Sequence, residues 1–342
     1  MLLKRRRIND VFTKRVKKKK NQTMMQPAED DDDEIFVYMG GDQQVPDEVR
    51  RARIHKSVKI VRARAFYRRR QLIYVEFHDG VEIIEERAFF NCYLLRGPIR
   101  LLGVKVIKEW AFKYTGLTDV EFGDKLETIE EEAFNRCSLL KSLRIPSVRN
   151  IGKLAFASCR ELSDAELGEG RLITLQEKPF NYCRTLRRIA LPLKSGLIED
   201  GFHNCPKLTT VDLVGGVHNT VASLHMESWR NEINDEINQI NQVLPNTDYW
   251  RKTVAIRQWM ESTVRLLDHC KAEHHRILKE ATTLLELALW KANLNDNEGG
   301  QLDREGVRTT RGRRKRARKE ICVTSGASIV IKNVLPFLQL LK

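Results

Sequence analysis

Phenylalanine recurs along the middle of this chain at intervals of 22 to 24 residues. Seven phenylalanines keep this spacing: Phe66, Phe89, Phe112, Phe134, Phe156, Phe180 and Phe202. A fixed period of this length is typical of a solenoid, in which each repeat is one structural unit that packs only on its neighbours. The spacing alone therefore predicts a stacked architecture for this part of the chain.

The residues around each phenylalanine also repeat. An aliphatic residue lies five positions before each one: Val61, Ile84, Ile107, Ile129, Ile151, Leu175 and Leu197. Alanine directly precedes the first five phenylalanines, and cysteine follows most of them after three positions. We expect the Phe ring to fill the core, Ala to permit close approach of the backbone, and Cys to pack as a small apolar group. The core should be less regular where Arg69 and Thr115 replace Cys and where Pro179 and Gly201 replace Ala.

An L-x-x-V-x-L pattern, or a close variant, follows this segment and predicts a β-strand. Its clearest examples are residues 72–77, 117–122, 140–145, 162–167, 186–191 and 208–213. The period of two turns Val75 and Phe77 inward and Glu76 outward. Strands in a sheet lie about 4.8 Å apart, so seven of them predict a parallel sheet on the order of 30 Å wide. Gly97-Pro98 lengthens one strand by a residue and Thr115-Gly116 shortens the next, which predicts two local kinks.

The combined pattern, I-x-x-x-A-F-x-x-C-x-x-L-x-x-V-x-L, resembles the leucine-rich repeats of the BspA type over about residues 61–213. The resemblance implies a curved solenoid whose concave sheet and adjoining loops bind other proteins, and it brings no catalytic residues. The expected fold is an α/β solenoid, a seven-unit leucine-rich repeat array with a parallel sheet, followed by an α-helical hairpin.

The chain around this array divides by composition. We expect a disordered basic and acidic tail (1–34), an N-terminal cap (35–60), the solenoid (61–215), a coiled-coil-like helical hairpin (216–294), and a linker with a basic run and a short apolar end (295–342). A cap is needed because the first repeat would otherwise expose its apolar face to water. The β-like run from Ile35 to Tyr38 lies where that cap is needed.

Two helices are expected after the solenoid, separated by Pro245. Thr247 or Asp248 has the side chain of an N-cap for the second, longer helix. Its apolar seam is spaced 4-3 throughout: Ile256, Met260, Thr263, Leu267, Cys270, His274, Ile277, Ala281, Leu284 and Ala288. Such spacing is typical of coiled coils. The pattern favours an antiparallel hairpin packed against the last repeat, and the alternative is a homodimer formed through the long helix.

The net charge of +14 is concentrated near the two ends of the sequence. The stretch that includes Lys4 and ends at Lys20 contributes +9, the run from Arg308 to Lys319 contributes +8, and residues 29–34 subtract six. About +3 remains for the middle of the chain. The basic runs are interpreted as nuclear import signals, as arms that bind the phosphates of nucleic acid, or as solvated tails. A soluble, intracellular protein is expected, in the nucleus, with the cytoplasm as the alternative.

No pattern in the sequence indicates a cofactor, a metal or an enzyme. His269, Cys270, His274 and His275 have ligand side chains, but Cys270 and His274 belong to the apolar seam and no second ligand pair has suitable spacing. Phosphate-binding loops, nucleophile elbows and the H-E-x-x-H motif are absent from the sequence. The apolar run from Ile329 to Leu341 is too short to span a bilayer, so no membrane association is expected.

The candidate binding surface is the outward row of the predicted sheet. It consists of Tyr74, Glu76, Arg100, Asp119, Glu121, Arg144, Asp164, Glu166, Arg188 and Asp212. The row has mixed sign, which suits a protein with complementary charges better than a phosphate backbone. The predicted function is a non-enzymatic scaffold for protein–protein interaction. The alternative is a nuclear protein whose basic tails bind nucleic acid while the solenoid recruits a partner.

Overall fold

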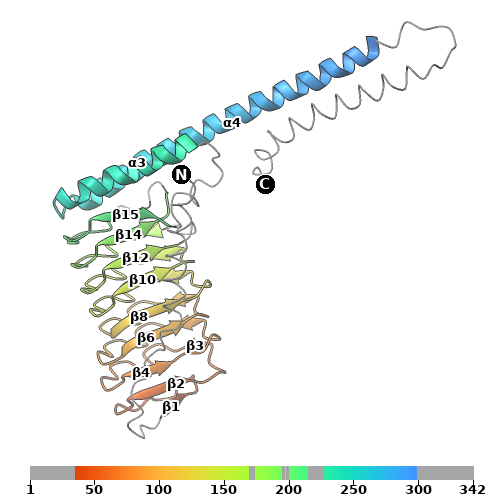
Figure 1. The fold of residues 1–342 in the computed structure, drawn as a ribbon. Helices are drawn as coiled ribbons and strands as arrows, with labels where there is room; N and C mark the ends of the chain where they lie inside the picture. The colour runs from red at the N-terminus through yellow and green to blue at the C-terminus, as the bar shows by residue number, and fades with distance from the viewer. Residues whose placement is uncertain (1–34, 169–173, 195–196, 198–199, 215–226, 299–342) are drawn as a thin grey trace, which may run out of the picture. The chain divides into compact units, whose positions relative to one another are not determined.

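A computed structural model of the chain describes residues 35–168, 174–194, 197, 200–214 and 227–298. Over these residues the fold is a parallel β-solenoid of about seven turns followed by long helices, as the sequence predicts (Figure 1). The predicted tail (1–34) and most of the last predicted segment (295–342) lie outside the described residues. The sequence-based domain boundaries stay predictions.

The longer strands of the repeats lie side by side and are parallel wherever their pairing is defined. They are β1 (Ile35–Tyr38), β2 (Arg51–Ile54), β4 (Tyr74–Glu76), β6 (Arg96–Leu101), β8 (Gly116–Phe122), β10 (Ser142–Ile145), β12 (Asp164–Leu167), β14 (Arg188–Leu191) and β15 (Thr210–Leu213). Their burial alternates as the period of two requires: Val75 is buried and Phe77 packs against the core, whereas Glu76 faces outward. From β4 to β15 each repeat contributes one such strand, and β1 and β2 precede them.

The expected single sheet is divided into three hydrogen-bonded groups, β1-β2-β4, β6-β8 and β10-β12-β14-β15. The first break lies beside Pro98, which has no N–H to donate to β4. The register of β6 against β8 shifts between Gly97 and Pro98, and the pairing passes over Thr118. The Thr118 carbonyl instead accepts a bond from the Lys141 N–H, 3.0 Å away, at the second break. An irregularity is therefore present at Gly97-Pro98, as predicted, and it interrupts the sheet. The extra residue, Thr118, lies in β8, and β8 is not shortened after Thr115-Gly116 but spans seven residues.

A second parallel sheet, which the sequence analysis missed, is formed by strands of two residues each. In spatial order it contains β13 (Thr174–Leu175), β11 (Asn150–Ile151), β9 (Thr128–Ile129), β7 (Val106–Ile107), β5 (Ile83–Ile84) and β3 (Ile60–Val61). The second residue of each strand is the buried aliphatic residue that lies five positions before a phenylalanine. The return segment of each repeat therefore begins as a strand.

The phenylalanines form a continuous stack through the core, and all seven are buried. Their ring centroids are 4.8 to 5.3 Å apart from Phe66 to Phe156, with nearly parallel planes. The spacing widens to 5.7 Å at Phe180 and 6.0 Å at Phe202, the two repeats in which Pro179 and Gly201 replace alanine. The predicted loss of regularity at these two positions is thus present in the stack.

Arg69 and Thr115, which replace cysteine in two repeats, each make hydrogen bonds of their own. Arg69 donates to the Val45 carbonyl and to Asp47, both at 2.6 Å, and so connects the first repeat to the segment before it. The Thr115 hydroxyl donates to the Phe112 carbonyl at 2.9 Å. Both substitutions are therefore accommodated by new polar contacts.

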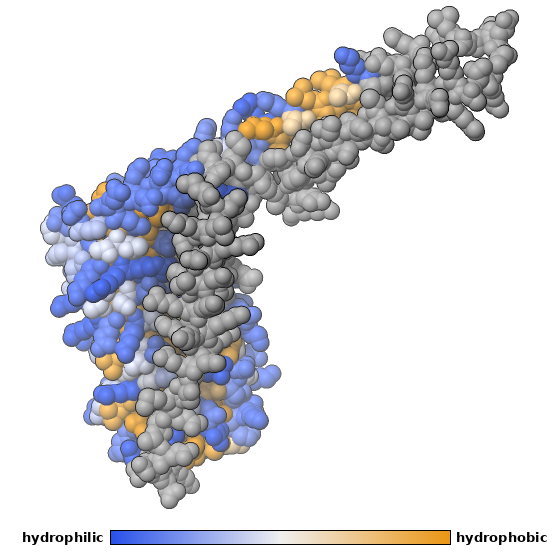
Figure 2. Space-filling model, viewed as in Figure 1, coloured by the Kyte–Doolittle hydropathy of each residue, from blue (hydrophilic) through white to orange (hydrophobic). Residues whose placement is uncertain are grey.

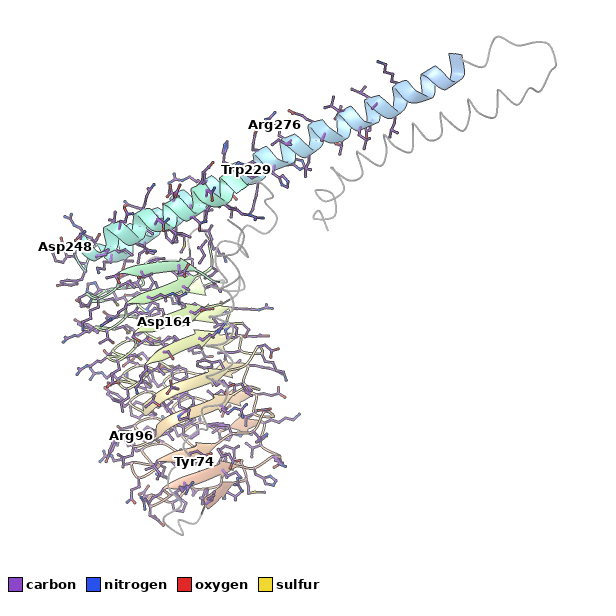
Figure 3. The ribbon with its side chains drawn as sticks, viewed as in Figure 1. Tyr74, Arg96, Asp164, Trp229, Asp248 and Arg276 are labelled. Carbon is purple, nitrogen blue, oxygen red and sulfur yellow. The ribbon has the colours of Figure 1, made fainter. Side chains whose placement is uncertain are left out.

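The helices cover the last repeat. Helix α3 (Glu227–Val243) and helix α4 (Lys252–Glu298) are joined through a 3-10 turn, η1 (Leu244–Asn246). The Trp229 ring near the start of α3 lies 5.9 Å from the His274 ring, well inside α4, so the two helices are antiparallel (Figure 3). This arrangement agrees with the predicted hairpin.

The predicted N-cap of the second helix is wrong. Neither Thr247 nor Asp248 is its N-cap, because the first helical bond runs from the Ala255 N–H to the Arg251 carbonyl. The Thr247 hydroxyl donates back to the Val243 carbonyl at 2.9 Å, and the Asp248 carbonyl accepts from the Arg251 N–H at 2.8 Å, so both close turns before the helix. At its other end α4 extends to Glu298, directly before Gly299 and Gly300, which are poor helix formers.

Candidate functional site

The outward side chains of the longer strands form two parallel columns, which we call the sheet face. All ten predicted binding residues lie in these columns, at outward positions of β4, β6, β8, β10, β12, β14 and β15. Figure 3 shows Tyr74 and Asp164 far apart along the same row of strands. Arg51 and Arg53 of β2 extend the columns, since they pair in register with Tyr74 and Glu76. The sequence analysis missed these two arginines because it did not predict β2.

Charges of opposite sign face each other on neighbouring strands of the sheet face. Three pairs join consecutive repeats, at N–O distances of 2.6 Å for Arg53–Glu76, 2.9 Å for Arg100–Glu121 and 3.6 Å for Arg144–Glu166. The hydrogen bond to Glu76 raises the pKa of the Arg53 guanidinium above its ordinary value. Cross-strand pairs of opposite charge stabilise a sheet modestly, and they fix the direction of both side chains.

Arg188 links three strands at the end of the sheet face. Its guanidinium lies 3.2 Å from a carboxylate oxygen of Asp164 on β12 and 3.1 Å from one of Asp212 on β15. The Arg188 guanidinium therefore forms ion pairs with an acid on each neighbouring strand, and its planar set of donors can bond to both carboxylates at once. As a result, the last strands carry a fixed network rather than separate charges.

Tyr74 and Asp119 are the predicted residues that stand outside this network among the described residues. Tyr74 is 37% exposed, and the Arg51 guanidinium lies 5.6 Å from its ring centroid. Asp119 is exposed on β8, and no ion pair is formed with it in the described part of the chain. These two side chains are the ones most accessible to a partner without breaking an existing pair.

The cysteines of the repeats are buried and make an unexpected set of hydrogen bonds. Each thiol donates to the carbonyl of the core phenylalanine one repeat earlier, at 3.0 to 3.4 Å, for Cys92, Cys137, Cys159, Cys183 and Cys205. Burial raises the pKa of Cys92, Cys137 and Cys205 to about 12. Because the thiolate is the reactive species, these thiols are structural.

The residues considered for a metal site do not assemble into one. Cys270 is buried in the α3–α4 interface, where burial raises the pKa of its thiol. Over the described ranges, no group of three or more His, Cys, Asp or Glu side chains is placed to hold a metal ion. Among the same described residues, no helix is both long enough and apolar enough to cross a membrane.

Several apolar side chains in the second half of α4 are exposed, although Leu278 is buried. Ile277 is 38% exposed and Leu284 is 67% exposed, whereas Met260 and Leu267 in the first half of the same seam are buried. Figure 2 shows apolar residues exposed on this helix. The homodimer predicted through the long helix would use this half, and it stays a prediction.

The comparisons with known proteins concern the repeats. Among solved structures, the chain is similar to a leucine rich repeat protein of T. pallidum, with 23% identity and a TM-score of 0.34 over 52% of this chain and 68% of that chain. It is similar to a leucine-rich repeat protein from Bacteroides ovatus, with 21% identity and a TM-score of 0.35 over 48% and 55%. A leucine rich cell surface protein from Faecalibacterium prausnitzii gives 21% identity and a TM-score of 0.34 over 50% and 61%. The chain thus spans less than two thirds of the last two proteins.

No curated protein matches the chain. Six copies of the BspA type leucine rich repeat region match it, over residues 47–101 and 105–231. These residues make up more than half of the sequence and include the whole described stack of phenylalanines. The chain therefore belongs to the family of BspA type leucine rich repeat proteins.

Proposed function

We propose that this protein is a non-enzymatic scaffold that binds a protein partner on the sheet face. The observation that carries the proposal is the ordered alternation of charge across the strands. Three cross-strand pairs succeed one another along the chain, and in each the base lies one repeat before the acid: Arg53–Glu76, Arg100–Glu121 and Arg144–Glu166. A surface whose charges are already held in place loses little side-chain freedom on binding.

The alternation also favours one class of partner over another. A polyanion such as nucleic acid requires a surface of one sign, because its affinity comes from many phosphates neutralised together. The sheet face instead places an acid beside nearly every base. A partner that presents the complementary pattern would gain specificity from it, since a shifted alignment brings like charges together.

Charge reversal tests the proposal. Full-length protein carrying Arg100→Glu and Arg144→Glu is used to capture partners from native lysate treated with nuclease. Both side chains are more than half exposed, so the free energy of unfolding should change by less than about 1 kcal/mol per lost pair. We expect a partner recovered by the wild-type protein to be lost with this variant.

The matched control reverses two exposed cations outside the sheet face, Lys125→Glu and Arg149→Glu, and changes the net charge equally. It should retain the partner. Equal recovery with both variants, or equal loss, would place the binding surface elsewhere.

A second function rests on the charge distribution along the sequence. Two basic segments lie outside the described residues, from Lys4 to Lys20 and from Arg308 to Lys319. Their combined positive charge exceeds the net charge of the whole chain. In this version the tails bind nucleic acid in the nucleus and the solenoid recruits a protein. If one run neutralises ~8 phosphates, the logarithm of the binding constant should fall with a slope near −7 against the logarithm of salt concentration. A slope near zero would argue against it.

A further inference from the structure

A hollow of about 190 Å³ lies on the repeats, lined by residues outside the longer strands. Its lining consists of Arg136, Ser158, Arg160, Tyr182 and Arg184. These residues belong to three consecutive repeats and lie in the turns that lead into β10, β12 and β14 (Figure 1). Pockets for whole small-molecule ligands measure about 300–1,000 Å³, so a hollow of this size suits a single chemical group.

The repeat itself produces the hollow. Arg136, Ser158 and Tyr182 occupy the same position in their repeats, two residues after the core phenylalanine, and all three have a positive φ of 60° or 61°. The shared backbone conformation directs the three side chains to the same side. Because Ser158 is much smaller than Arg136 and Tyr182, a gap opens between them. Arg160 and Arg184, at another shared position, border that gap.

The lining carries positive charge without a matching acid. Elsewhere on the repeats many cations pair with acids across neighbouring repeats, as Lys105 does with Glu82 at 2.6 Å. Arg136, Arg160 and Arg184 form no such ion pair with any described residue. The Ser158 hydroxyl likewise has no hydrogen-bond partner among the described residues. The Arg136 guanidinium lies 5.3 Å from the centroid of the Tyr114 ring in the preceding repeat. Arg160 and Arg184, each with a planar set of five donors, therefore line the hollow without an acidic or aromatic partner among the described residues.

We infer that this hollow binds a phosphate group of the monoester class. Guanidinium groups bind phosphate oxygens in bidentate fashion, and a phosphate monoester offers three strong acceptors with a charge near −2 at neutral pH. Ser158 adds a hydroxyl donor to the lining, and the Tyr182 ring offers a flat surface to an aromatic group that carries the phosphate. The inference is independent of the sheet face.

Calorimetric titration of the full-length protein tests the inference, with inorganic phosphate and phosphotyrosine as separate probes. We expect saturable binding at one site for at least one probe. Tighter binding of phosphotyrosine would point to a phosphorylated side chain, and equal binding to the free ion. Arg160→Gln and Arg184→Gln should each weaken binding about tenfold, because each removes a charged hydrogen-bonding partner. Arg160→Lys keeps the charge but loses the planar fork, so it should give an intermediate loss.

The matched control is Arg144→Gln, which removes the same charge from an exposed arginine on the sheet face. Its affinity for either probe should stay within about twofold of the wild type. Equal weakening by Arg144→Gln and Arg160→Gln would show unspecific attraction to a basic protein and overturn the inference. The absence of saturable binding of both probes to the wild-type protein would overturn it as well.

Discussion

Each repeat cysteine combines two roles in one small side chain. It fills a space beside the core phenylalanine, and its thiol donates to a carbonyl of the preceding repeat, as Cys92 does to Phe66 at 3.0 Å. A carbonyl at this position faces the core, where an unsatisfied acceptor would be costly. Thr115, which replaces a cysteine, donates instead to the Phe112 carbonyl of its own repeat. Arg69, the other replacement, donates to Val45 and Asp47. The bond to the preceding repeat is therefore specific to the five repeats that carry the cysteine.

The first prediction concerns the reactivity of these thiols. Cys322→Ser removes the one cysteine of the seven that lies outside the described residues. Raising the pH from 7 to 9 ionises an ordinary thiol, whose pKa is about 8.5. It should leave thiols such as Cys92 and Cys137, with pKa values of about 12, protonated. We expect negligible reaction of the folded variant with a disulfide reagent at either pH, and reaction of six thiols in denaturant.

A fast phase in the folded Cys322→Ser variant that grows between pH 7 and pH 9 would contradict this result. It would mean that at least one of the six remaining thiols, the five of the repeats and Cys270 of α4, is accessible and ionises normally.

The second prediction concerns the phenylalanine stack. Phe134 lies between Phe112 and Phe156 at 5.1 and 5.3 Å, and the Phe122 ring meets it edge-on at 5.8 Å. Phe134→Ala should lower the free energy of unfolding by about 3–5 kcal/mol, because it removes these contacts and leaves a cavity. Urea denaturation measures the change.

The control for the stack is Tyr93→Ala. Tyr93 is 49% exposed and lies outside the buried core, so its loss should cost less than about 0.5 kcal/mol. Similar costs for the two variants would mean that the stacked rings do not hold the repeats together.

At the scale of the elements, the helical hairpin completes hydrogen bonds that a further repeat would have made. The Asn241 amide on α3 accepts from the Val211 N–H at 2.7 Å and donates to the Val211 carbonyl at 3.0 Å, as a neighbouring strand would. The Lys252 ammonium on α4 donates to the carbonyls of Pro206 and Leu208. Burial lowers the pKa of that lysine. The exposed edge left by β15 is therefore covered by side chains of the hairpin.

The third prediction follows from this cap. Asn241→Ala leaves both backbone groups of Val211 without their present partner, which should lower the free energy of unfolding by about 1–3 kcal/mol. The Val211 amide should exchange its hydrogen at least about tenfold faster in the variant. Hydrogen exchange followed by mass spectrometry measures this difference.

The matched control is Asn234→Ala, which removes the same kind of side chain from an exposed position of α3. This variant should leave the exchange of Val211 unchanged. Equal exchange in the wild-type protein and the Asn241→Ala variant would show that the Asn241 amide does not protect the strand.

The sequence predicts the repeats well because their signal is periodic and long. It misses the two-residue strands, since a pair such as Ile83–Ile84 is too short to show alternation. It also misses β2, although Ala52 and Ile54 alternate with two arginines and were available as a signal. The sequence shows that Pro98 lacks the backbone N–H whose loss we connect with the first break in the sheet. It does not show which residues of the neighbouring strands lie opposite Pro98, so the break could not be predicted.

In the candidate sites, too, the periodic features could be predicted from the sequence and the contacts between repeats could not. The outward positions of the sheet face follow from the period of two, so all ten candidate residues could be placed from the sequence. Their pairing could not, because the partners are separated by about a full repeat, as Arg100 and Glu121 are. The hollow at Ser158 requires comparison of the same turn position in three repeats, and the sequence analysis compared only the core positions.

At the scale of the whole molecule, the charge is divided between the sequence ends and the repeats. The basic runs account for the net charge of +14, whereas the sheet face is close to neutral through its own ion pairs. The proposed function follows this division, with protein recognition by the repeats and any attraction to nucleic acid by the basic runs. A protein partner should consequently be retained after nucleic acid has been removed.

The most direct test of this account is photo-crosslinking from the sheet face. A benzoylphenylalanine in place of Tyr74, which is 37% exposed on β4, is compared with one in place of Tyr93, which is exposed outside the sheet face. Full-length protein is irradiated in lysate with and without nuclease. The account predicts a defined protein adduct from position 74 that survives nuclease and is absent from position 93. An adduct from position 93 alone, or one lost after nuclease, would contradict it.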